Sequence, residues 1–188
     1  MVQSPLDIVV LVGSLRKESF SRKLALALAE LAPDDLALRI VEIRQLPFYD
    51  QDLETETPPA EWAAFRAEIR RADGVLFVTP EYNRSVPAVL KNAIDVGSRP
   101  YGKSAWDGKP GAVASISTGQ YGAFGANHHL RQSMVFVNVA MLQQPEVYLA
   151  KAASLFDGQG RLTNPETADF LRKFLDAFRV WVRRHGQE

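Results

Sequence analysis

The stretch LDIVVLVGSLRKESFSRKLALALAELAP, residues 6–33, runs from an apolar segment through a polar loop into a helix-like sequence. Up to Gly13 it is an apolar run rich in Val and Ile, which is typical of a strand buried on both faces of a parallel sheet. Leu24, Leu28 and Leu31 then recur at helical spacing, and the closing proline ends the helix. Strand, loop and helix in this order predict the first unit of a sheet covered by helices.

The same alternation of strand and helix signals continues along the chain. We predict the remaining strands over residues 36–43, 74–79, 111–117 and 146–150. The remaining helices are predicted around residues 62–69 and 89–96, over 122–137, and from Pro165 onward, where aromatic residues recur at helical spacing. Five strands interleaved with five helices favour an α/β fold, a doubly wound, mostly parallel sheet with helices on both faces. Because no linker or internal repeat interrupts this pattern, we expect residues 1–188 to form one domain.

Composition and charge restrict the chemistry that this chain can perform. Its 22 basic and 22 acidic side chains give zero net charge, so we expect no nucleic-acid partner and no anionic membrane partner. The absence of cysteine excludes disulfides, thiolate catalysis and cysteine-ligated metal sites, so any redox chemistry must come from a cofactor. No basic leader precedes the first apolar run, and no segment reaches the roughly 18 apolar residues of a membrane span. The expected location is the cytoplasm.

Two other kinds of catalytic site find no support in the sequence. His128 and His129 are neighbours, and adjacent residues of a helix diverge by about 100°, so we expect no metal site. The GxSxG pattern of a nucleophilic serine is absent around Ser115 and Ser117. The informative positions are therefore the polar loops after the first, third and fourth predicted strands, because ligands of doubly wound sheets bind at the carboxyl ends of strands.

The first of these loops, residues 13–21, has the composition of a phosphate site. Glycine permits a tight turn, serine hydroxyls and one arginine can donate hydrogen bonds, and a helix N-terminus begins beside them. The candidate donors are Ser14, Arg16, Ser19 and Ser21. The nucleotide loop GxxxxGK[ST] lacks its second glycine and the lysine after it, and the dinucleotide pattern GxGxxG would need glycine at Leu15, so neither fits. An ordinary serine-rich helix cap with one exposed arginine is the alternative.

The other two loops could hold a flat heteroaromatic ligand. The loop at 79–85 offers backbone amides, an aromatic face and a carboxamide from Glu81, Tyr82 and Asn83. The loop at 117–125 has closely spaced glycines, which let a backbone approach a ligand. A proline-bounded connection whose tyrosine covers the core, and a flexible turn, are the respective alternatives. Three such loops at neighbouring strand ends nevertheless favour one shared site.

Four segments together resemble a known family. They read GSLRKESFSRKLA, PEYNRSVPAVLKNAIDVGSRP, STGQYG and HLRQSMVFVNVAMLQQPEVYLAKAASLFDGQGRL. In this order and separation they are similar to the NADPH-dependent FMN reductase family, in particular its chromate and quinone reductase branch. The resemblance covers roughly residues 8–162. It implies a flavodoxin-like fold with strand order 2-1-3-4-5 and FMN bound without a covalent link.

The resemblance also assigns residues to the flavin. The phosphate of FMN would be held by Ser14, Arg16, Ser19, Phe20 and Ser21. The isoalloxazine ring would be bordered by Pro80, Glu81, Tyr82 and Asn83 on one side and by Ser117, Gly119 and Gln120 on the other. Because the cofactor carries the chemistry, no residue is assigned as a catalytic acid or base.

The activity that the resemblance implies is an FMN-dependent NAD(P)H oxidoreductase. Hydride would pass from NADPH or NADH to FMN and then to a small-molecule acceptor in the same place, in a ping-pong scheme. Quinones are the expected acceptors, with chromate, azo compounds, nitro compounds and free flavin also open. Arg84, Arg99 and Tyr101 are predicted to line the entry of the second substrate; ordinary surface charge beside a loop aromatic is the alternative.

Two other functions are compatible with the same fold. A flavodoxin-type electron carrier would have an acidic surface and a phosphate loop without arginine, so zero net charge and Arg16 favour the enzyme. A reductase that releases reduced FMN as product stays open.

The family usually forms dimers or tetramers, so a homodimer or homotetramer is expected. In close relatives an arginine often stands at the position of Gly125 and takes part in subunit contacts with the glutamate that matches Glu146. Because this chain has a glycine there, the departure bears on the expected tetramer and not on the fold.

Overall fold

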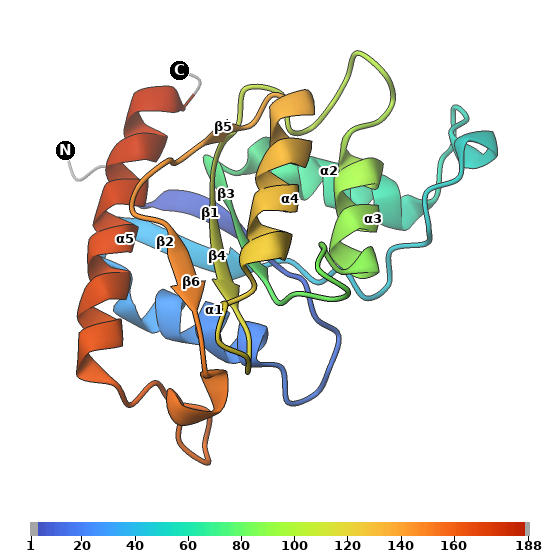
Figure 1. Cartoon of the computed structure of the whole chain (residues 1–188). Helices are drawn as coiled ribbons and strands as arrows, with labels where there is room; N and C mark the ends of the chain where they lie inside the picture. Colours follow the sequence, from blue (N-terminus) through green and yellow to red (C-terminus); the bar gives the residue numbers. More distant parts are fainter. Residues whose placement is uncertain (1–3, 187–188) are drawn as a thin grey trace.

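The computed structural model describes residues 4–186 of the chain (Figure 1). The strands are β1 (Leu6–Val12), β2 (Leu36–Ile40), β3 (Gly74–Thr79), β4 (Pro110–Ile116), β5 (Ala140–Met141) and β6 (Val147–Leu149). The α-helices are α1 (Phe20–Leu31), α2 (Ala60–Arg71), α3 (Ala88–Gly97), α4 (Phe124–Phe136) and α5 (Pro165–His185). Two short 3₁₀ helices, η1 (Gln51–Leu53) and η2 (Ala152–Ser154), lie in the connections.

The sheet is parallel, and its strand order is β2-β1-β3-β4-β5, with β6 also pairing with β4. The fold class and the predicted strand order are therefore confirmed. The strand predicted at 146–150 is β6, whereas β5 was missed because two residues carry no readable alternation. The fifth position of the sheet is thus divided: β5 pairs with the start of β4 at Pro110, and β6 pairs with its end at Ile116.

Helices cover both faces of the sheet, as Figure 1 shows. Helices α1 and α5 pack on one face, where alternate residues of β1 such as Val10 meet Leu24 and Leu28. Helices α2, α3 and α4 pack on the other face, where the intervening residues such as Leu11 meet Trp62. Both faces of β1 are therefore buried, which explains why its sequence is nearly continuous in apolar residues.

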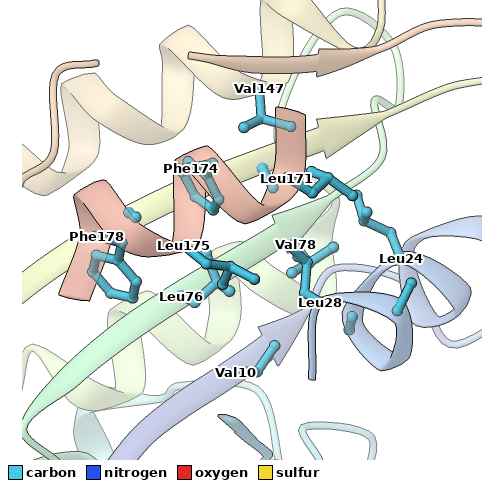
Figure 2. Close-up of a cluster of buried hydrophobic side chains, with 14 of the residues drawn as sticks. Val10, Leu24, Leu28, Leu76, Val78, Val147, Leu171, Phe174, Leu175 and Phe178 are labelled. Atoms are coloured by element: carbon cyan, nitrogen blue, oxygen red, sulfur yellow. The ribbon is translucent and has the colours of Figure 1, made fainter. Parts of the chain in front are cut away.

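Helix α5 closes one of these two cores. Figure 2 shows Leu171, Phe174, Leu175 and Phe178 directed toward the sheet, beside Leu76 of β3. These four helical residues are at most 1% exposed. The aromatic spacing predicted for this helix is thus mainly a core feature.

The parallel registers bring three loops to one edge of the sheet. Val12 of β1 is level with Val78 of β3, and Thr79 is level with Ser115 of β4. The chain segments that follow these strands consequently start side by side, which gathers the three polar loops predicted from the sequence.

Candidate functional site

The first loop leaves β1 at a position where only glycine fits well. The N–H of Gly13 donates to the carbonyl of Val78 at 2.9 Å, which keeps the backbone against β3. A Cβ at Gly13 would lie 3.1 Å from Oγ1 of Thr79 and 3.2 Å from Cδ of Pro80. Such contacts are tighter than ordinary packing, so a side chain here would displace the second loop.

Ser19 caps helix α1. Its Oγ accepts a hydrogen bond from the backbone N–H of Arg22 at 3.2 Å, and Ser19 is 3% exposed. Ser21, the second residue of α1, is 1% exposed, and no described residue hydrogen-bonds to its hydroxyl. The helix N-terminus therefore presents backbone donors together with an unused hydroxyl, an arrangement that suits an anion.

Arg16 supplies an available cation in the same loop. It is exposed, and among residues 4–186 no acidic side chain forms an ion pair with it. The nearby Glu18 is instead paired with Lys23 at 3.1 Å. A doubly charged anion at this end of the cleft would thus meet a guanidinium whose charge is not already neutralised.

The second loop is a tight hairpin. Tyr82 and Ser85 exchange backbone hydrogen bonds of 3.1 and 3.0 Å, and the two residues between them have positive φ, 51° at Asn83 and 62° at Arg84. Positive φ at both central positions is the pattern of a type I′ turn. The turn leaves the ring of Tyr82 72% exposed, so its face is open to a flat ligand.

The third loop is tied to the segment after β6. Ser117 donates its N–H to Leu149 at 3.0 Å, and its carbonyl accepts from Ala152 at 3.0 Å. The carbonyl of Gly119 accepts from Lys151 at 2.9 Å. These bonds fix the loop backbone without using the side chain of Ser117.

The three loops line one cleft of about 660 Å³, a size within the usual range of small-ligand sites. Its walls are largely apolar, through Phe20, Val89 and Ile116, and Ser14, Arg16 and Ser21 bring polar groups into the same cleft. An elongated molecule with a flat apolar part and an anionic end matches this lining.

The structure brings most of the predicted flavin residues together in this cleft. Those that line it are Ser14, Arg16, Ser19, Phe20, Ser21, Pro80, Glu81, Tyr82 and Ser117. Asn83, Gly119 and Gln120 belong to the same loops but not to the lining. Residues that the sequence analysis did not single out also line it: Leu15, Pro87, Ala88, Val89, Ile116 and Thr118. Pro87 is the N-cap of α3, and Ala88 and Val89 are its first two residues; a proline at a predicted helix start after a buried strand is the signal that could have found them.

The three residues predicted for the second substrate do not line this cleft. The guanidinium of Arg84 lies 5.8 Å from the ring of Tyr121, at the hairpin turn. Arg99 and Tyr101 line a different hollow, of about 360 Å³, together with Phe136 of α4. They therefore do not share the lining of the main cleft.

Behind the third loop, Tyr148 contacts several polar groups. Its hydroxyl lies 3.0 Å from Nε2 of His128. Burial is the main cause that raises the pKa of Tyr148 to about 12, and a hydrogen bond with Glu146 contributes in the same direction. His129 makes a separate contact with Ser85, 2.9 Å from its Nδ1. Within the described part of the chain, no three His, Cys, Asp or Glu side chains gather as metal ligands would, and no helix has the length and apolarity to cross a membrane.

Comparisons with known proteins place this geometry in context. A quinone reductase from Pseudomonas putida is 62% identical over 177 residues, 94% of this chain and 95% of that protein. A 2-hydroxy-1,4-benzoquinone reductase from a Burkholderia species is 46% identical over 178 residues, 95% of this chain and 97% of that protein. Among solved structures, FerB from Paracoccus denitrificans, a flavoenzyme NAD(P)H:(acceptor) oxidoreductase, has a TM-score of 0.90 and 40% identity, covering 96% of this chain and 98% of that one.

The match to the family is equally extensive. Residues 6–154, from the start of β1 to the end of η2, match the family described as NADPH-dependent FMN reductase. This span includes all three loops of the cleft. The fold, the cleft and the similarity over almost the whole chain agree: the chain belongs to the NADPH-dependent FMN reductase family.

Proposed function

We propose that this chain transfers electrons from NADPH or NADH to quinones, with FMN held in the cleft between the three loops. The observation that carries the proposal is the cleft itself, where an unpaired Arg16 and an unused Ser21 hydroxyl share one lining with apolar walls. The relatives named quinone reductase and 2-hydroxy-1,4-benzoquinone reductase support the choice of acceptor.

The residues of the cleft fit FMN in both their chemistry and their arrangement. The FMN phosphate would meet Ser14, Arg16, Ser19 and Ser21, where a helix N-terminus and a guanidinium both favour negative charge. The apolar walls and Pro80, Glu81, Tyr82 and Ser117 would border the ring. When bound, FMN supplies the capacity to accept electrons from a nicotinamide and pass them to a quinone.

The chain's own contribution is then binding, orientation and access. Tyr82 is largely exposed at the rim, so one face of a flat ligand stays accessible to a second flat molecule. Nicotinamide and quinone would use this face in turn, which predicts ping-pong kinetics. Asn83, Gly119 and Gln120 would act through the backbone of their loops, and Arg84 would border the entry.

An assembly of two or four chains is part of the same proposal. Val135 and Phe136 at the end of α4 are 80% and 81% exposed, and Tyr101, which lines the same hollow as Phe136, is 87% exposed. Exposed apolar groups that lie together favour burial against another protein surface, and a second copy of this chain is the partner that we propose. Sedimentation equilibrium of the native chain and of Phe136→Lys tests this, since a loss of the dimer only in the variant is expected.

The activity is tested by flavin binding followed by reduction. Apoprotein is titrated with FMN and with riboflavin, and the complex is then mixed anaerobically with NADPH or NADH before a quinone is added. Arg16→Ala should weaken FMN binding by about 1.5–3 kcal/mol and leave riboflavin binding nearly unchanged, because riboflavin has no phosphate. Arg172→Ala, in an exposed ion pair of α5, is the control.

Each outcome has a distinct meaning. Binding, bleaching by a reduced nicotinamide and turnover with quinone support the enzyme. If FMN binds but neither nucleotide reduces it, a flavodoxin-type electron carrier replaces this proposal. If FMN does not bind, the assignment of the cleft is wrong.

A further inference from the structure

The loop that carries Arg16 is also held from its outer side. A hollow of about 220 Å³ lies there, lined by Ser14, Leu15, Arg16, Lys17, Arg22, Glu42 and Arg44. Arg44 comes from the segment after β2, and its guanidinium donates a hydrogen bond to the backbone carbonyl of Leu15. No other described residue donates to that carbonyl.

We propose that Arg44 is a positioning residue for the phosphate of FMN, acting through the peptide bond between Leu15 and Arg16. This inference rests on the proposed function, since it assumes that the loop at 13–21 binds the phosphate. Arg44 itself does not line the main cleft.

The planarity of the peptide bond links the two sides of the loop. In a trans peptide the carbonyl and the N–H point in opposite directions, so fixing the carbonyl of Leu15 outward directs the N–H of Arg16 inward. That N–H lies 3.4 Å from Oγ of Ser14, a residue that borders both the cleft and the outer hollow. A contact of this length is weak, so the N–H remains ready for a stronger acceptor such as a phosphate oxygen.

An ion pair between α1 and the segment after β2 lies beside Arg44. Arg22 of α1 bonds to Glu42 at 2.5 Å. The Arg22 hydrogen bond is the main cause that lowers the pKa of Glu42, and the charge of Arg44 contributes in the same direction. Arg44 in turn reaches Leu15. The middle of the loop is therefore joined to the segment after β2, and the pair of Arg22 with Glu42 joins that segment to α1.

The middle of the loop is where an anchor matters most. Gly13 is held by its bond to Val78, and Ser19 by its bond to Arg22, but residues 14–18 form no helix or strand between these points. A backbone that must be ordered upon binding lowers affinity, so an anchor at Leu15 should improve the binding of FMN.

The positive charge of Arg44 could also raise the affinity for FMN, and this contribution can be separated from that of the hydrogen bond. The cations Arg16, Lys17, Arg22 and Arg44 outnumber the single carboxylate of Glu42 around the hollow. A long-range field is screened by salt, since the Debye length falls from about 10 Å at 0.1 M to about 3 Å at 1 M. A direct hydrogen bond that orients a peptide persists at high salt.

The test compares FMN with riboflavin, because only FMN has the phosphate. Dissociation constants of both flavins are measured with apoprotein by quenching of flavin fluorescence, at about 0.1 M and about 1 M salt. Arg44→Met removes the donor and keeps similar length, while Arg44→Lys keeps a charged donor. Arg70→Met is the matched control, since Arg70 also donates to a backbone carbonyl, that of Lys103, but lies before β3, at the opposite end of the sheet from the cleft.

For Arg44→Met we expect FMN affinity to fall by about three- to tenfold, with riboflavin affinity changed by less than about twofold, at both salt concentrations. Arg44→Lys should restore part of the loss, and Arg70→Met should change neither flavin. The ratio of the two affinities is independent of the folded fraction, so partial unfolding of a variant does not hide the effect.

Three results would overturn the inference. One is an unchanged ratio in Arg44→Met while Arg16→Ala still lowers it, in which case the phosphate loop stands and only the role of Arg44 is wrong. Another is a changed ratio that disappears at high salt, which would assign the effect to charge. If Arg16→Ala leaves the ratio unchanged as well, the phosphate loop itself is misassigned, and the proposed function fails together with this inference.

Discussion

The carboxylate of Glu81 accepts a hydrogen bond from the backbone N–H of Ala126 at 3.1 Å, which joins the second loop to the first turn of α4. The intervening space is kept open by Gly125, since a Cβ there would lie 2.8 Å from Oε2 of Glu81 and 2.9 Å from the carbonyl of Arg84. This glycine thus has a structural consequence. It lets a carboxylate reach the N-terminus of a helix, where negative charge is favourable.

Removal of this carboxylate should loosen both the loop and the helix. For Glu81→Ala we expect the free energy of unfolding of the apoprotein to fall by about 1 kcal/mol, the usual effect of losing a cap. FMN binding should weaken too, since Glu81 lines the cleft. Urea unfolding and flavin titration measure the two effects. Glu30→Ala, at an exposed position of α1, should change neither, and equal losses in both variants would refute the role assigned to the bond.

Gly122 is required by its backbone conformation and by its neighbours. Its φ is 56°, and a Cβ would lie 2.5 Å from the carbonyl carbon of Tyr148, a backbone atom that cannot move aside. Gly122→Ala should therefore lower the free energy of unfolding by about 3 kcal/mol, combining left-handed strain with overpacking. Thermal unfolding of both variants measures the loss. Gly158→Ala is the control, because nothing lies within 4 Å of the methyl group added there. A loss in Gly122→Ala no larger than in the control would show that β6 can shift.

The gathering of the three loops could be predicted because it follows from local patterns, whereas the order of the strands came from the resemblance to the family. An apolar run such as that of β1 indicates burial on both faces, and polar residues after such runs must meet at one edge of a parallel sheet. Ser19 combined the two roles that the sequence left as alternatives: it caps α1 and also lines the cleft. A cap and a ligand site use the same helix N-terminus, so local sequence alone could not separate them.

Features that depend on contacts between distant segments of the chain could not be predicted from the sequence. The bond from Arg44 to Leu15 joins segments that follow different strands, and an arginine after a short strand looks like ordinary surface charge. Arg99 and Tyr101 follow α3 closely in the chain, yet they line a separate hollow beside α4. Sequence proximity to a site predicts neighbours along the chain, whereas the path of a loop decides which cavity its side chains line.

A buried ion pair fixes the long connection between β2 and α2. Arg66 and Glu54 meet at 2.6 Å with side chains 4% and 12% exposed, and Nε of Arg66 also donates to the carbonyl of Val96 at 2.8 Å. Glu54→Gln should lower the free energy of unfolding by about 3 kcal/mol, because a buried guanidinium loses its countercharge. Asp169→Asn breaks an exposed pair with Arg172 and should cost less than about 0.5 kcal/mol. Denaturant unfolding of both variants measures these free energies. Similar losses in Glu54→Gln and Asp169→Asn would mean that water reaches the guanidinium of Arg66.

The raised pKa of Tyr148 makes a prediction for alkaline solutions. Burial and the bond with Glu146 hold the proton until about pH 12 in the folded chain, against a usual value of 10.0. The unfolded chain therefore releases this proton first, and the stabilisation present below pH 10 is lost as the pH rises toward 12. Stability measured across this range should fall more steeply for the native chain than for Tyr148→Phe, and tyrosinate absorbance should lose one late-titrating group in the variant. Identical slopes would contradict the shift.

Substitutions of Ser19 can separate helix capping from phosphate binding. Its Oγ accepts from Arg22 at 3.2 Å, so Ser19→Ala should lower the stability of the apoprotein by about 1 kcal/mol and also weaken FMN binding. Ser19→Asp keeps a good capping oxygen, and the apoprotein should keep its stability. The added carboxylate would repel a phosphate bound at the same helix N-terminus, so FMN affinity should fall by at least about tenfold, while riboflavin affinity changes little. Urea unfolding without flavin, and fluorescence titration with each flavin, give the two sets of values. A stable Ser19→Asp variant that binds FMN as tightly as the native chain would place the phosphate elsewhere, because like charges at a common site cannot leave affinity unchanged.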